Sequence, residues 1–392
     1  MSVPYYTICL LPWIHFDEAF HVNECSFLPF PEHGFGDDFK CSVNEVLKSY
    51  RDINQDQITQ CTLAVVQDKS PIWQLDESEG DLGKVEHNLA LFFLAAFASN
   101  DYGGQHATYC NSSPFQPIFQ NLTIPPRGKA VQQRRRYGSL LDGGYNHGDL
   151  IFSRPLECKS LRLVVDKIFL AGLDSVAKSQ SNLYRRILNS LSFVRLANTD
   201  QSHMSFESEA VLLAAAFEIL FDADDKYSLT CKYRSCFDDY KTKIVSGVLQ
   251  ERPGIKLEEG ENKGRDLQWQ LGRKWIQELY DLRSSVVHGS DLSARQWGWH
   301  PFEHLLIGAF VYPLAVKILL KNVGRYTLSN KDKLDCMAID FILASNDWCK
   351  PVNERSNQSN WQKAVSDAMW QSHSMDFAEM LKKDSRRSKG VA

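Results

Sequence analysis

The sequence predicts an α+β protein, with a mixed N-terminal domain over residues 1–150 and a helical domain over residues 151–330. The first region contains short apolar runs separated by Pro- and Gly-containing turns, a pattern typical of strands. From residue 156 onward, apolar residues instead recur at helical spacing over long segments. A chain of 392 residues that is 43% hydrophobic and 23% charged has room for two or three domains.

The N-terminal region combines strand patterns with one clear helical pattern. The clearest strand patterns are Tyr5–Leu11 and Thr62–Val66. The helical pattern, His87–Ala98, is apolar nearly all round, so we expect that helix to be buried. These elements predict an α+β accessory domain.

Beyond residue 150 the helical patterns are separated by polar segments. The expected helices are Ser181–Ala197, Phe206–Phe221, Asp266–Gly289 and His304–Tyr326, with a polar insert over Lys226–Arg265. Residues 331–392 add two weak helical patterns, Cys336–Ala344 and Trp361–Trp370, and a basic tail. We therefore expect a helical bundle followed by a C-terminal helical extension.

Composition argues against several classes of protein. A net charge of −4 provides no general attraction to nucleic acid, so any RNA contact has to be a local patch. The 10 cysteines form no pair at zinc-binding spacing, which favours free thiols in a reducing compartment. The apolar N-terminus lacks a positively charged start and contains Pro4 and Pro12, unlike a signal peptide. The longest apolar run, Leu305–Val316, is too short to span a bilayer, so we expect a cytoplasmic protein without membrane contact.

Motifs for bound cofactors and metals are missing from the sequence. It has neither a glycine-rich phosphate-binding loop nor the helical histidine pair of zinc proteases. It also has no serine nucleophile elbow and no acidic cluster suited to two metals. We therefore expect no cofactor and no metal.

The strongest candidate site lies at the end of the expected helix Asp266–Gly289. An apolar stripe runs along this helix, formed by Leu271, Trp275, Leu279, Leu282 and Val286. Gly289 suits the left-handed position just past a helix end. Arg283 keeps its charge at all relevant pH values, and His288 moves protons near neutral pH. A second pair with the same spacing, Arg295 and His300, lies in a segment without helical periodicity, and we interpret it as a coincidence.

The segment Tyr280–Gly289, YDLRSSVVHG, resembles the signature helix of the HEPN superfamily, and most closely its Apea-like group. The family's R-x4–6-H motif falls on Arg283 and His288, while Ser284 stands where the family often has Asn. The resemblance covers roughly residues 155–330 and implies an antiparallel helical bundle. It also implies a homodimer in which two copies of the pair surround one RNA phosphate.

The same resemblance implies a metal-independent endoribonuclease that leaves a 2′,3′-cyclic phosphate and a 5′-OH end. Because the attacking 2′-OH belongs to the RNA, the protein has to supply only proton transfer, by His288, and charge stabilisation, by Arg283. The family further suggests a toxin-like effector of anti-phage defence or abortive infection. In that role, the N-terminal domain would be a sensing domain on which a phage-derived trigger or partner protein acts.

Two further residues are candidates for supporting roles. Burying an unpaired carboxylate among apolar residues costs free energy. Glu218 therefore either pairs with Arg283 and orients it across the bundle, or is exposed to solvent. Tyr280, one turn before Arg283, either contacts the substrate or packs against its neighbours.

Several arginines are either RNA contacts or simply solvated side chains. An RNA contact is a candidate role because clustered arginines bind phosphate bidentately. They are Arg134, Arg135 and Arg136 in a basic segment, and Arg185 and Arg186 on the first expected helix. The alternative for the whole helical domain is a non-catalytic HEPN-type module that binds RNA or a protein and dimerises. Arg283 and His288 would then be ordinary polar residues at a helix end.

Overall fold

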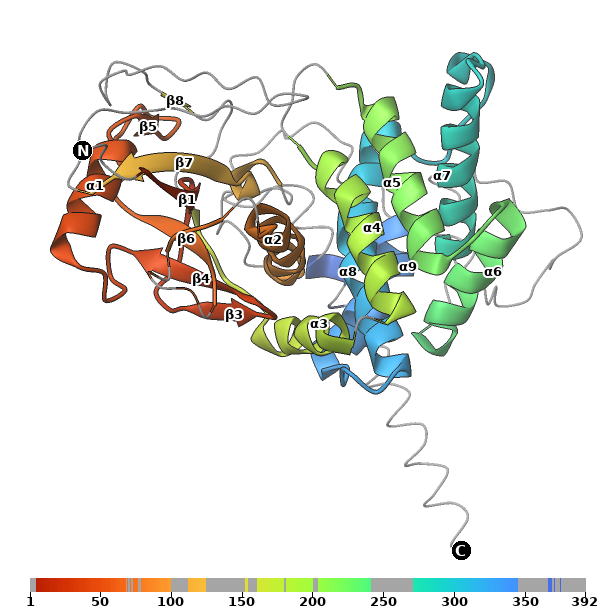
Figure 1. Cartoon of the computed structure of the whole chain (residues 1–392). Coiled ribbons are helices and arrows are strands. Elements are labelled where there is room, and N and C mark those ends of the chain that lie inside the picture. The colour runs from red at the N-terminus through yellow and green to blue at the C-terminus, as the bar shows by residue number, and fades with distance from the viewer. Residues whose placement is uncertain are drawn as a thin grey trace, which may run out of the picture. The chain divides into compact units, whose positions relative to one another are not determined.

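A computed structural model describes residues 5–67, 69, 71, 73–76, 79–99, 112–124, 152–153, 161–179, 181–199, 204–240, 271–344, 366–368, 370 and 374. The chain divides into two compact units. The first is Met1–Tyr184 with Asn198–Ser202, and the second is Arg185–Ala197 with His203–Ala392. The first contains an antiparallel sheet and the second is helical, which confirms the mixed α and β class (Figure 1).

The N-terminal unit is built on a five-stranded antiparallel sheet with strand order β3-β4-β6-β1-β7. Its strands are β1 (Tyr5–Leu11), β3 (Phe20–Val22), β4 (Cys25–Phe30), β6 (Cys61–Val66) and β7 (Ile118–Thr123). Two short parallel pairs join β2 (Ile14–His15) to β9 (Leu161–Arg162) and β5 (Tyr50–Arg51) to β8 (Phe152–Ser153). Both expected strands are present, and the second begins at Cys61.

Helices cover both faces of the sheet, α1 (Asp37–Leu47) on one side and α2 (Asp81–Phe97) on the other (Figure 1). On the α1 side, Leu28 and Leu63 of the sheet join a buried cluster with Phe39 of α1. Strand side chains alternate between the two faces. Because both faces are buried at the centre of the sheet, every residue of β4 and β6 is buried, and neither strand alternates between buried and exposed residues.

On the other face, the sheet packs against α2. The register places Ala64 of β6 between Cys9 of β1 and Phe27 of β4. The rings of Phe27 and Phe92 are stacked with their centroids 4.4 Å apart, so this row of residues faces α2. Every residue of α2 from Asn88 to Phe97 is buried, which confirms the expectation for this apolar helix.

A third helix, α3 (Lys167–Ser179), packs against α2 and against the edge strand β3 of the sheet (Figure 1). The Asp166 N–H donates a hydrogen bond to the carbonyl of Ala95, with 3.1 Å between nitrogen and oxygen. The N-terminal unit therefore extends to Tyr184, beyond the boundary that the sequence suggested at residue 150. The reason is that an apolar helix such as α2 needs cover on all sides.

The helical unit begins within α4. Its helices are α4 (Asn182–Leu196), α5 (Phe206–Phe221), α6 (Lys226–Phe237), α7 (Leu271–Val287), α8 (Pro301–Asn322) and α9 (Asn330–Ala344). The bounds of α5 match the prediction because both ends carry clear signals. Ser205 accepts a hydrogen bond from the Ser208 N–H at the start, and Asp222 adopts a left-handed φ of 55° at the end.

Side-chain contacts give the directions of α5 and α8. Leu213 of α5 packs against Gly308 of α8. One turn further along both helices, the ring centroids of Phe217 and Tyr312 are 5.8 Å apart. These two helices therefore run in the same direction.

Two other helix pairs run in opposite directions. Lys226 at the start of α6 bonds to Asp281 near the end of α7, with 2.8 Å between nitrogen and oxygen. Lys317 near the end of α8 pairs with Asp332 near the start of α9 at 2.7 Å. Antiparallel neighbours are thus present, as the family resemblance implies, together with the parallel pair α5 and α8.

The interpretation of Lys226–Arg265 as a polar insert is wrong for its first part, where α6 forms. Leu229 and Tyr233 of α6 are buried, although charged residues surround them in the sequence. The expected extension after residue 330 is also part of the helical unit, because the Gly272 N–H of α7 donates to Asp340 of α9 at 3.1 Å. Most of the other expected helix, Trp361–Trp370, lies outside the described residues.

One helix in the described part of the chain, α8, is long and apolar enough to cross a membrane by length and composition. However, 83% of its most apolar window is buried inside the protein, as in the core helix of a globular fold, so it is weak evidence for a span. The cytoplasmic location stays a prediction.

Because α5 and α8 approach closely at Gly308, we expect a methyl group added at this position to lower the stability of the protein. A Cβ added at Gly308 would overlap the Leu213 side chain, so Gly308→Ala should lower the free energy of unfolding by about 1–3 kcal/mol, measured by urea unfolding. Gly83→Ala is the matched control, because a Cβ on that α2 glycine meets nothing within 4 Å. It should stabilise the protein by about 0.4–1 kcal/mol. A neutral Gly308→Ala would contradict the packing of these two helices.

Candidate functional site

The candidate site lies where α7 leaves the core of the helical unit. The predicted stripe is buried at Leu271, Trp275, Leu279 and Leu282 but not at Val286, which is half-buried. No residue of α7 after Leu282 is buried. Gly289 follows the helix with the expected left-handed φ of 66°. The last turn of α7 therefore offers its side chains to solvent or to a partner.

Arg283 lies between two neighbours at this end of α7. Its Nε atom is 3.8 Å from a carboxylate oxygen of Glu218 on α5, and its guanidinium carbon is 5.8 Å from the centroid of the Tyr280 ring. Burial raises the pKa of the Glu218 carboxyl, and the positive charge of Arg283 opposes that rise. The side chain of Arg283 remains 32% exposed, so it is held in place and still accessible.

His288 lies one residue past the end of α7 and is exposed. The backbone N–H of His288 donates a hydrogen bond to the carbonyl of Ser284, with 3.0 Å between nitrogen and oxygen, which continues the hydrogen bonding of the helix. Ser284 itself is half-buried. Five residues correspond to about 140° around a helix, so Arg283 and His288 leave α7 in different directions. One chain alone therefore does not direct both side chains at a single atom.

The other predicted RNA contacts are five arginines that precede α7 in the sequence. Arg134, Arg135 and Arg136 lie outside the described residues. Arg185 is exposed on α4, and Arg186 is half-buried there. The role of both arginines of α4 as RNA contacts stays a prediction.

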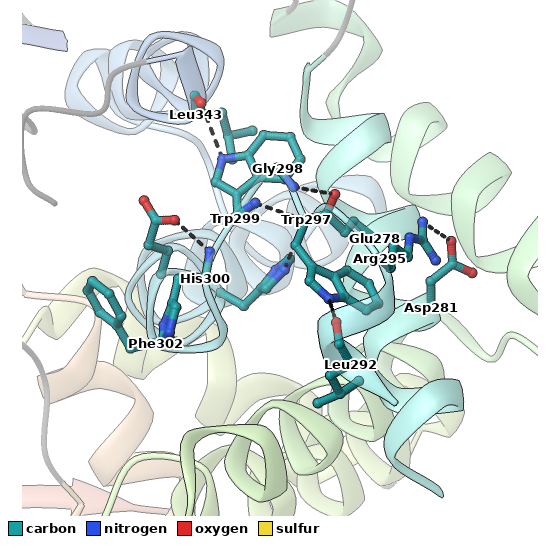
Figure 2. A network of polar contacts seen from close by, with 12 residues as sticks. Glu278, Asp281, Leu292, Arg295, Trp297, Gly298, Trp299, His300, Phe302 and Leu343 are labelled. Atoms are coloured by element: carbon teal, nitrogen blue, oxygen red, sulfur yellow. Dashed lines mark hydrogen bonds and ion pairs between the residues drawn. The ribbon is translucent and has the colours of Figure 1, made fainter. Parts of the chain in front are cut away.

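Sequence reasoning missed how firmly the segment after His288 is held (Figure 2). We call Gly289–His300 the connector, since it joins α7 to α8. The Glu278 carboxylate accepts hydrogen bonds from the N–H groups of Gly298 and Trp299, at 2.9 and 2.8 Å. The buried Trp299 indole in turn donates to the carbonyl of Leu343 at 3.2 Å.

A second carboxylate of α7, Asp281, holds the connector at another point (Figure 2). It accepts a hydrogen bond from Arg295 of the connector at 3.0 Å and pairs with Lys226 of α6 at 2.8 Å. The Arg295 guanidinium also lies 4.4 Å from the centroid of the Trp297 ring. One feature of the sequence could have indicated these contacts. Glu278 and Asp281 are three residues apart on one helix, so their carboxylates share a face of that helix.

The second pair with Arg-x4-His spacing does not lie on a helix. Arg295 follows the short 3-10 turn Leu292–Ala294, and His300 caps the start of α8. The Phe302 N–H donates to the His300 ring, while the His300 N–H donates to the Glu303 carboxylate. This arrangement gives His300 a local structural role.

In the part of the chain that the structure describes, no group of three or more His, Cys, Asp or Glu side chains is arranged to hold a metal ion. Comparison with protein-family models, with curated proteins and with solved structures finds no match.

The contact of Glu218 with Arg283 predicts a pH effect. Removing the cation in Arg283→Ala should raise the pKa of Glu218 further, which a carboxyl NMR titration would measure. A carboxyl with a raised folded-state pKa stabilises the protein fully below its unfolded pKa, and that contribution is lost as pH rises through the folded pKa. The loss of unfolding free energy that accompanies ionisation of Glu218 should therefore continue to a higher pH in Arg283→Ala than in the parent protein.

The matched control for this effect is Glu218→Gln, which removes the titrating group. In that background, Arg283→Ala should leave the pH dependence of unfolding unchanged. An unaltered Glu218 pKa in Arg283→Ala would show that the two side chains do not interact.

Proposed function

We propose that the helical unit is a metal-independent endoribonuclease that acts as a homodimer. The observation that carries this proposal is the end of α7, where Arg283 lies between Glu218 and Tyr280 and His288 is exposed past the last turn. A guanidinium and an imidazole are the groups that RNA transesterification requires of a protein. The resemblance of Tyr280–Gly289 to the HEPN signature helix supports the same reading.

In the proposed reaction the 2′-oxygen of the RNA forms a bond to the adjacent phosphorus, and the bond from phosphorus to the 5′-oxygen breaks. His288 takes the proton from the 2′-OH or delivers a proton to the leaving 5′-oxygen. Arg283 binds the non-bridging oxygens and stabilises the charge that develops on them. The products are a 2′,3′-cyclic phosphate and a 5′-OH end.

A single imidazole does not serve both sides of the phosphorus at once, so we propose that a second copy supplies the other histidine. Two-fold association is the commonest way in which a chain presents the same surface twice. The tip of α7 suits such contact, because Val287 beside His288 is 56% exposed. The alternative, a non-catalytic module that binds RNA or protein, uses the same surface without proton transfer.

The cellular role that we propose is defence against phage by RNA cleavage in the cytoplasm, with the N-terminal unit sensing a phage-derived trigger or partner protein. This part rests on the family resemblance alone. Growth of cells that express the parent chain or His288→Ala, with and without phage, tests it. Equal growth of both strains under phage challenge would remove the proposal.

Substitution of either motif residue should abolish cleavage while leaving the fold intact. His288→Ala should lower the rate of RNA cleavage by roughly 10²–10⁴, the usual contribution of general acid–base catalysis. Arg283→Ala should lower the rate by roughly 10²–10³, since it removes electrostatic stabilisation. The measurement is single-turnover cleavage of labelled RNA in EDTA, with end-group analysis.

Arg273→Ala is the matched control, because Arg273 is an exposed arginine at the start of the same helix. It should cleave like the parent protein. RNA binding without cleavage by the parent, unchanged in His288→Ala, would favour the non-catalytic module instead.

The dimer is tested at the tip of α7. Val287→Lys places a desolvated charge in the proposed contact, so it should shift the protein toward monomer in sedimentation and reduce cleavage in parallel. A cation at a helix C-terminus does not destabilise the monomer. Val323→Lys, at the C-terminal cap of α8 where Val323 is 53% exposed, is the control and should do neither. Full cleavage by a monomeric Val287→Lys would rule out a composite site.

A further inference from the structure

Three aromatic side chains form a row where α5 and α8 begin. The ring centroids of Phe206 and Phe302 are 6.1 Å apart, and those of Phe302 and His300 are 5.0 Å apart. Phe206 is 52% exposed, His300 is exposed and Phe302 is half-buried. We call Phe206, Phe302 and His300 the aromatic row.

Two members of the aromatic row, Phe302 and His300, are held by hydrogen bonds at the start of α8. The His300 ring accepts a hydrogen bond from the Phe302 N–H at 3.4 Å, and the His300 N–H donates to Glu303 at 2.6 Å. The preceding residues of the connector are bound to Glu278. Rings that are already fixed lose little conformational entropy when a ligand binds to them.

A stack that carries a cation lies earlier in the connector, separated from His300 by the buried residues Gly298 and Trp299 (Figure 2). Arg295 lies over the Trp297 ring at 4.4 Å and is 48% exposed, with Asp281 holding its guanidinium. Lys226, which shares Asp281, is 43% exposed. The connector therefore presents aromatic rings and cations together, in the segment that begins just after His288.

We infer that the aromatic row and the Arg295–Trp297 stack bind unpaired bases of the single-stranded RNA whose phosphate lies at the end of α7. Phe206 and Glu218, the contact of Arg283, are 12 residues and therefore about 18 Å apart along α5, so the aromatic row would bind bases several nucleotides from that phosphate. This inference rests on the proposed function. Bases without a pairing partner stack on aromatic side chains and on arginine, whatever their sequence. Bases within a duplex are already stacked and paired, so this surface selects single-stranded over double-stranded RNA.

Fluorescence anisotropy of full-length protein tests this inference in a His288→Ala background, which keeps the RNA intact. The probes are a short labelled single-stranded RNA and the same RNA annealed to its complement. Phe206→Ala should weaken single-strand binding roughly tenfold, the usual contribution of one stacked base, and should leave duplex binding unchanged. Because Phe206 is half exposed, its removal leaves the core of the unit intact.

Two controls isolate the contribution of the ring. Phe206→Tyr keeps an aromatic face and should bind single strands like the parent. Tyr227→Ala removes a more exposed aromatic side chain, 77% exposed on α6, and should also have no effect. Unaltered single-strand binding in Phe206→Ala, or a chain that binds no RNA, would overturn the inference. Loss of self-association in Phe206→Ala, seen by sedimentation without loss of RNA binding, would overturn it in favour of a protein interface.

Failure of this inference and failure of the proposed function give different results. Binding that depends on Phe206 in a parent chain that cleaves no RNA would support the aromatic row and refute the nuclease. If the parent chain cleaves RNA and Phe206→Ala binds RNA as tightly as the parent chain does, the nuclease proposal would be supported and binding of RNA by the aromatic row would be refuted.

Discussion

Three helices of the helical unit pack against one side chain, the fully buried indole of Trp275 on α7. Its ring centroid lies 5.6 Å from that of Phe217 on α5 and 6.0 Å from that of Tyr233 on α6. The ring of His304 on α8 lies 6.2 Å away. Because these contacts fix the rotation and the height of α7, they also determine where Arg283, about two turns later, meets its neighbours.

The two ends of α7 differ in the kind of contact they make. Apolar side chains from Leu271 to Leu282 are buried along one side of α7, whereas Glu278 and Asp281 contact the neighbouring segments through their carboxylates. Glu278 and Asp281 bind the connector, and Glu218 of α5 faces Arg283 from outside the helix. An apolar core with a polar, accessible helix end is suited to holding charged groups in defined positions for a ligand.

Local signals explain which parts could be predicted from the sequence. The helix Phe206–Phe221 carries its own caps, and the end of α7 is marked by Gly289, so both were predictable. The helix α6 was not, because few apolar residues such as Leu229 stand among charged ones and their burial depends on α7. The role of Glu278 was equally hidden, because its partners are backbone N–H groups of a distant segment, which no side-chain motif records. The contact of Glu218 was one of two open alternatives.

The cover that α3 provides for α2 has a consequence for biosynthesis. The whole run from Asn88 to Phe97 is buried, and part of its cover begins only at Lys167, far along the chain. During translation this apolar helix emerges from the ribosome well before α3 does, so one of its sides stays exposed in the nascent chain. We expect this segment to be a binding site for chaperones on nascent chains, and truncated chains that end before α3 to aggregate.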